Sequence, residues 1–106
     1  MPKPVELDAA FTAELLTLLE QAEAIGVRQA RLLEQVKKFG GVSCARELVR
    51  KGRLSDGFEA LAAAKRLDLS LEALVTAGKY GALFTDDAVN ACFGALCDAG
   101  YYVFQS

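Results

Sequence analysis

Residues 85–100 read TDDAVNACFGALCDAG and carry the local signals of a complete α-helix. Thr85 is a suitable N-cap, and Asp86 and Asp87 suit the positive end of the helix dipole. Gly100 is typical of the position after a helix, because glycine adopts the left-handed conformation without steric cost. Apolar residues between these ends recur at the spacing of one helix face. The segment therefore predicts a helix that buries one side.

Similar capping signals occur through the rest of the chain. The predicted helices of the second half are 44–51 after Ser43, 56–66 after Ser55, and 71–77 after Ser70. Apolar periodicity predicts two earlier helices, over 9–25 with Asp8 as N-cap, and over 27–39, which ends at the Gly40-Gly41 pair. We therefore predict an all-α fold of five or six helices, a single domain over residues 1–106. Its expected parts are a helical hairpin over 8–39 and a multi-helix unit over 42–104.

The same periodicity predicts which side chains form the core. The expected core residues are Phe11, Leu15, Leu18, Leu33, Val36, Leu48, Phe58, Leu61, Leu74, Phe84, Val89, Phe93 and Leu96. Residues 101–104 (YYVF) have strand composition, but the sequence offers no partner strand. We expect an extended C-terminal tail laid across the helices. A binding strand or an aromatic interface cluster are the alternatives.

Composition argues against an enzyme. The chain of 106 residues has 53% hydrophobic residues, enough for a core, but it has no histidine. It therefore lacks the commonest general base and most zinc sites, and we expect no catalytic residues, cofactor or metal. The three cysteines are expected to be small core residues in a reducing cytoplasm. Neither a signal peptide nor a membrane-spanning stretch is evident, so we expect no role in a membrane.

Charge is distributed unevenly along the chain. The net charge of −2 divides into about −4 over residues 1–27, +6 over 28–66 and −4 over 67–106. The basic middle suits nucleic-acid phosphate, whereas the acidic ends suit a positively charged protein groove. Ordinary solvated helix faces account for the same pattern. Residues 55–77 have helix-turn-helix spacing, but the second helix offers no side chain that reads bases, so we expect a packed helical pair.

The second half of the chain resembles a known type of module. The residues that carry the resemblance are Leu54 to Phe58 (LSDGF), Arg66 to Val75 (RLDLSLEALV), Lys79-Tyr80, Leu83 to Thr85 and Gly100 to Tyr102. Over 42–103 they look like a helical module appended to bacterial defence-related and mobile-element proteins. In length, acidity and helical content the chain is also similar to small phage anti-CRISPR proteins that act on type I-E systems. That resemblance implies stoichiometric protein binding without catalysis, and it transfers no individual site residue.

Two functions therefore remain open. The first is a protein-binding inhibitor that blocks a type I CRISPR–Cas surveillance complex or its recruited nuclease. The second is a nucleic-acid-binding or regulatory adaptor that uses Arg46, Arg50, Lys51, Arg53, Lys65 and Arg66. Because interfaces draw their binding energy from aromatic and arginine anchors, we expect one partner-binding face. Its predicted residues are Arg50, Arg53, Arg66, Tyr80, Tyr101 and Tyr102. The alternative is that the tyrosines pack onto the helices with only their hydroxyls exposed.

Overall fold

The computed structural model of the chain describes residues 4–101. The regular structure within that range is helical and contains no strand, which confirms the predicted all-α fold. The α-helices are α1 (Pro4–Ala24), α2 (Ala30–Phe39), α3 (Gly41–Lys51), α4 (Phe58–Ala63), α5 (Leu71–Val75) and α6 (Asp86–Asp98). Two short 3₁₀ helices, η1 (Leu67–Leu69) and η2 (Gly81–Leu83), precede α5 and α6. Apart from Tyr101, the predicted tail lies outside the described residues.

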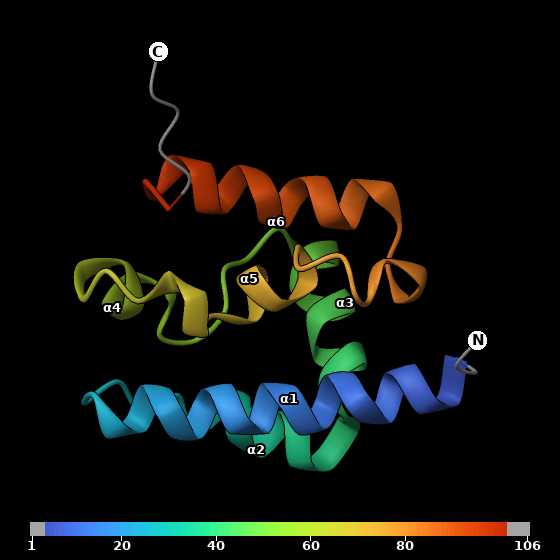
Figure 1. The fold of residues 1–106 in the computed structure, drawn as a ribbon, viewed down its shortest axis with the longest axis horizontal. Coiled ribbons are helices and arrows are strands. Elements are labelled where there is room, and N and C mark those ends of the chain that lie inside the picture. The colour runs from blue at the N-terminus through green and yellow to red at the C-terminus, as the bar shows by residue number, and fades with distance from the viewer. Residues whose placement is uncertain (1–3, 102–106) are drawn as a thin grey trace.

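The long first helix and the last helix lie on opposite sides of the fold. In Figure 1, α1 runs along one side of the fold and α6 along the opposite side, with α3, α4 and α5 between them. The larger core cluster contains buried residues of α1, α2, α3, α5 and α6. The predicted hairpin over 8–39 and the predicted unit over 42–104 therefore share one core.

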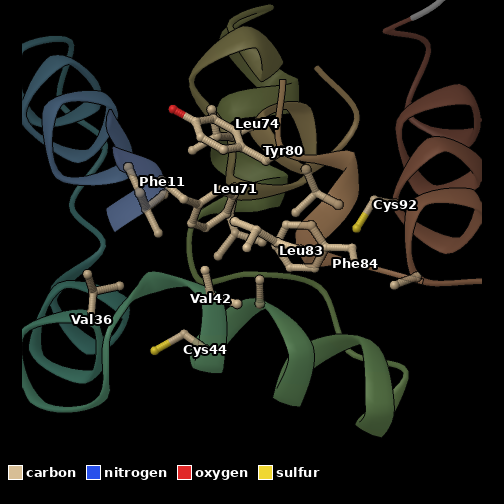
Figure 2. Packing of buried hydrophobic residues seen from close by; sticks show 14 of the residues in the cluster. Phe11, Val36, Val42, Cys44, Leu71, Leu74, Tyr80, Leu83, Phe84 and Cys92 are labelled. Carbon is tan, nitrogen blue, oxygen red and sulfur yellow. The ribbon is translucent and has the colours of Figure 1, made fainter. Parts of the chain in front are cut away.

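Aromatic rings join α1 to the segment between α5 and α6 in this core. The Phe11 ring of α1 meets the Tyr80 ring at 5.2 Å and the Phe84 ring at 5.3 Å between centroids, both edge to face. Figure 2 shows these rings beside Leu71 and Leu83. Edge-to-face pairs add about 0.5–1.5 kcal/mol to the free energy gained from burial. The core thus holds the segment between α5 and α6 against α1.

Two of the predicted caps are confirmed. The Ser70 hydroxyl accepts a hydrogen bond from the Ala73 N–H at 3.1 Å, and Thr85 caps α6 through the Ala88 N–H at 3.1 Å. At the start of the chain the prediction of Asp8 as a cap is wrong, because α1 already begins at Pro4. Proline is favoured in the first turn, where its missing N–H has no intrahelical partner to lose.

The predictions of Ser43 and Ser55 as caps are also wrong. Helix α3 already begins at Gly41, which leaves Ser43 inside its first turn. Helix α4 begins after Gly57, and Ser55 instead donates its side-chain hydroxyl to the Glu72 carboxylate at 2.6 Å. Contacts distant in sequence therefore replace local capping at both sites.

One predicted core residue is wrong as well. The Phe93 side chain of α6 is 41% exposed, although the other twelve expected core residues are buried or half-buried. The buried face of α6 is formed by Ala88, Cys92 and Leu96, which follow one another at four-residue spacing. Phe93 is rotated by about 100° from Cys92 on the same helix and so falls outside that face.

Candidate partner-binding surface

A groove of about 520 Å³ lies between α2 and α3. We call it the α2–α3 groove; its lining includes Phe39, Cys44, Glu47, Leu48, Lys51 and Arg53. Phe39 ends α2, the next four belong to α3, and Arg53 follows α3. The groove therefore combines apolar, basic and acidic side chains from neighbouring segments.

Two glycines set the position of the helices that form this groove. Gly40 alone separates α2 from α3, and its φ of +87° is a conformation that other residues rarely adopt. Gly41 approaches α1 so closely that an added Cβ would lie 3.2 Å from the Thr12 Cα. The Gly41 N–H also donates to the Thr12 hydroxyl at 2.9 Å. The start of α3 is thereby attached to α1, and the chain turns sharply at the end of α2.

Phe39 provides the apolar part of the surface. Its side chain is 61% exposed, more than any other large hydrophobic residue that the structure describes as exposed. The Lys38 ammonium lies 5.4 Å from the centroid of the Phe39 ring, a cation–π contact. Leu48 is half-buried and Cys44 is buried, so the groove has an apolar floor. Burying a phenylalanine releases roughly 1.5–3 kcal/mol, which this ring has largely not gained within the fold.

Cations gather at the ends of both helices. Lys37 and Lys38 occupy the last turn of α2, and Arg50 and Lys51 the last turn of α3, where the helix dipole favours positive charge. Glu47 contributes a carboxylate to the lining of the groove. This carboxylate pairs with the Arg50 guanidinium and lies 3.4 Å from the Lys51 ammonium.

The pairing shifts the pKa values of both groups. The hydrogen bond from Arg50 lowers the pKa of Glu47 below its ordinary value, and the same contact raises the pKa of Arg50. Glu47 therefore remains charged in the groove over the physiological pH range. Arg53 adds a further cation at the end of the groove.

The structure brings together only part of the predicted face. Arg53 lines the α2–α3 groove, and Arg50 pairs with Glu47 beside it. Arg66 lies elsewhere, just before η1, where it pairs with Asp68 at 3.1 Å. Tyr101 is exposed after α6, and Tyr102 lies outside the described residues.

Tyr80 contradicts the prediction of an exposed anchor. Its side chain is only 5% exposed, and its hydroxyl donates to the Glu14 carboxylate at 2.9 Å. Burial, and secondarily the bond to Glu14, raise the pKa of Tyr80 above its ordinary value. The alternative expectation of a packed tyrosine is therefore confirmed at this position. The ring stabilises the core beside Phe11, and partner binding has no access to it.

Sequence reasoning missed Phe39. The residue continues the spacing of Leu32 and Val36, which are both buried, and that pattern indicates a third buried residue. The helix ends at Phe39, however, and the turn at Gly40 leaves the ring on the surface. The local signal was the position of an aromatic residue between two lysines and two glycines.

Arg46 and two of the cysteines have structural roles in the fold. Arg46 donates to the Leu83 carbonyl oxygen from Nε at 3.1 Å and from Nη2 at 2.6 Å, and so joins α3 to η2. Cys44 and Cys92 are buried, as expected of small core residues. Burial raises the pKa of the Cys44 thiol and, with help from the Glu72 charge, that of Cys92 to about 12. Both thiols therefore stay protonated at neutral pH.

In the predicted helix-turn-helix segment, α4 packs chiefly on η1 and α5 packs on α6 and η1, so α4 and α5 do not form the expected packed pair. Leu71, Glu72, Leu74 and Val75 of α5 are buried, so the candidate recognition helix faces the interior.

Over residues 4–101, no cluster of cysteine and acidic side chains could hold a metal ion. Among those same residues, no helix combines the length and the apolar character needed to cross a membrane.

Comparison with family models, with curated proteins and with solved structures found no match to this chain.

Proposed function

We propose that this protein is a non-enzymatic inhibitor that acts by stoichiometric binding to a partner protein in the cytoplasm. The observation that carries the proposal is the α2–α3 groove, where the exposed Phe39 ring lies among cations. Interfaces draw most of their energy from a few aromatic and arginine anchors, and both types of residue are present here. The resemblance to small anti-CRISPR proteins supports the narrower form: a phage or mobile-element anti-CRISPR protein directed against a type I-E-like surveillance complex or its recruited nuclease.

The exposed cations around the groove suit a role in the rate of association with a partner as well as in affinity. Cations at the rim of an interface steer an acidic partner toward the site and raise the association rate. Lys37, Lys38 and Arg53 are exposed and suit that role. The apolar floor beneath Phe39 then supplies the burial that holds the complex together.

The alternative is a nucleic-acid-binding adaptor of a bacterial defence or mobile-element system. The exposed cations of α2 and α3 favour it. Three arginines of the basic middle, however, already bind groups within the fold: Arg46 bonds to a carbonyl oxygen, Arg50 to Glu47 and Arg66 to Asp68. Phosphate contacts would therefore compete with contacts already made, which makes protein binding the better-supported function.

Reconstitution with purified components tests the proposal. The chain is mixed with a type I-E surveillance complex and, separately, with its nuclease, and each mixture is analysed by gel filtration and by DNA cleavage. We expect a defined stoichiometric complex with one of them and loss of cleavage. Phe39→Ala should abolish complex formation, whereas Ile25→Ala, which trims another exposed apolar residue outside the groove, should not.

Two results would contradict this function. If no Cas component forms a complex, the anti-CRISPR assignment is wrong. If the chain alone shifts a DNA or RNA fragment in a gel, and the shift weakens steeply as salt increases, the adaptor function replaces the inhibitor function.

A further inference from the structure

We infer that the α2–α3 groove selects an acidic segment of its partner that carries one large apolar side chain; this inference rests on the proposed protein-binding function. The apolar side chain would enter between Phe39 and Leu48, over the buried Cys44. A carboxylate of the same segment would reach Arg53 at the other end, next to Lys51, which already lies 3.4 Å from Glu47. The order of these residues along α3 gives the groove an apolar end and a basic end.

The size of the groove favours a short segment. Its volume of about 520 Å³ falls in the range of roughly 300–1,000 Å³ that is typical of sites for small ligands. Such a volume accommodates a few side chains of an extended strand or of one helix face. The floor is narrow because Leu48 and Cys44 both lie on α3, four residues apart, with Phe39 opposite on α2.

The spacing between the two ends predicts a pattern in the ligand. Cys44 and Lys51 are seven residues apart on α3, which corresponds to about 10 Å along a helix that rises about 1.5 Å per residue. An extended segment covers about 10 Å in three residues. The apolar residue and the acidic residue should therefore lie three positions apart in an extended ligand, or about seven positions apart in a helical one.

Charge within the groove favours a carboxylate-bearing peptide over nucleic acid. The Glu47 carboxylate lines the groove between Cys44 and Lys51 along α3, and it is negative at neutral pH, as a glutamate of ordinary or lowered pKa is. A nucleic-acid strand carries a phosphate at every nucleotide and would bring negative charge next to Glu47. A peptide needs to bring only one carboxylate, which can pair with Arg53 while Lys51 balances Glu47 at 3.4 Å. The complementarity therefore selects an acidic peptide.

Selection from a random library tests this inference without knowledge of the natural partner. A phage library of random twelve-residue peptides is selected on the immobilised wild-type chain. The two most enriched sequences are then synthesised with fluorescein, and their affinities are measured by anisotropy. We expect enrichment of peptides that pair a large apolar residue with an acidic residue at one of the two predicted spacings.

Variants then locate the binding site. Phe39→Ala and the double variant Lys51→Glu with Arg53→Glu should each weaken binding of the selected peptides by about tenfold or more. The double variant should in addition reverse the dependence of affinity on salt, because its glutamates repel the acidic peptide and salt screens that repulsion. Ile25→Ala and Arg31→Glu change exposed residues outside the groove and should leave affinity unchanged. Because their changed side chains are exposed, Phe39→Ala, Ile25→Ala and Arg31→Glu should keep nearly the wild-type melting temperature, whereas the double variant places a second carboxylate four residues from Glu47 and should melt slightly lower while remaining folded.

Several outcomes would overturn the inference. They are failure to enrich any sequence, enrichment of basic or uncharged peptides, and equal affinity for the groove variants and the controls. Two further results would also overturn it. The first is a fluorescein-labelled single-stranded DNA that binds more tightly than the peptides. The second is a dimer of the chain, detected by sedimentation, that is held together by this face. These failures remain distinct from failure of the inhibitor function, because reconstitution with Cas components tests that function without any peptide.

Discussion

Replacement of Glu72 by alanine should destabilise the fold more than the loss of any exposed charge. The Glu72 side chain is 3% exposed, and its carboxylate accepts hydrogen bonds from the Ser55 N–H at 2.7 Å and from the Ser55 hydroxyl at 2.6 Å. An alanine leaves both buried donors without an acceptor. Each such donor costs about 1–3 kcal/mol, so we expect a loss of roughly 3 kcal/mol.

That loss is large for a domain of this size. Small domains are stable by about 5–15 kcal/mol, and 1 kcal/mol corresponds to roughly 4–8 °C in melting temperature for 60–100 residues. We therefore expect Glu72→Ala to lower the melting temperature by roughly 12–24 °C. Glu72→Gln keeps one acceptor oxygen and should lose about half as much. Ser55→Ala removes the hydroxyl but not the N–H and should cost about 1 kcal/mol.

Urea unfolding followed by circular dichroism measures these changes. Glu59→Ala is the matched control, because Glu59 is an exposed glutamate on α4 and its loss should fall within about 0.5 kcal/mol of wild type. A double-mutant cycle with Ser55→Ala and Glu72→Ala should give a coupling energy of about 1 kcal/mol or more. If Glu72→Ala differs from Glu59→Ala by less than about 1 kcal/mol, the argument from buried donors is wrong.

Three further predictions concern packing and titration. Gly41→Ala should destabilise the fold by about 1–3 kcal/mol, because the added Cβ would lie 3.1 Å from the Phe11 ring. Gly94→Ala has open space around the added Cβ and should stabilise the fold by about 0.5–1 kcal/mol. Thermal melts of the two variants check the sign, and equal shifts in melting temperature would refute the close approach at Gly41. Burial raises the pKa of the Cys92 thiol from 9.0 to about 12. The stability that the folded state gains from this neutral thiol is therefore complete below about pH 9 and is lost as the pH rises toward 12. The unfolding free energy should therefore fall between about pH 9 and about pH 12, and less so in Cys92→Ala; a slope unchanged by that substitution would contradict the assignment. Tyr80→Phe removes one hydrogen bond and should cost about 0.5–1.5 kcal/mol by urea unfolding, with no effect on peptide binding, and a loss of binding would mean that Tyr80 belongs to the site after all.

Local signals predicted the elements of the fold better than their boundaries. Ser70 and Thr85 cap the helices that follow them, because their partners lie three residues away in the sequence. Ser43 and Ser55 have the same chemistry but do not cap. Gly41 begins α3 through a contact with Thr12, and Ser55 binds Glu72, so tertiary contacts decide both positions.

The candidate site was predicted only in part for a related reason. Arg50 and Arg53 were identified because an excess of basic residues is visible in the sequence. Burial of Tyr80 depends on Phe11 and Glu14, about 66 residues earlier in the chain, which no local pattern reports. Phe39 shares the spacing of buried neighbours, and only the turn after it exposes the ring.

The hydrogen bonds between Ser55 and Glu72 also restrain the backbone next to the α2–α3 groove. Arg53 precedes Ser55 by two residues in the connection between α3 and α4, so the buried bond limits the conformations open to Arg53 before any partner arrives. The chain then loses less conformational entropy at Arg53 when a partner binds, which favours tight binding. The Ser55 amide, bonded inside an otherwise irregular segment, should exchange its hydrogen with solvent more slowly than its neighbours. Its exchange rate reports how often this connection leaves α5 and carries Arg53 away from the groove.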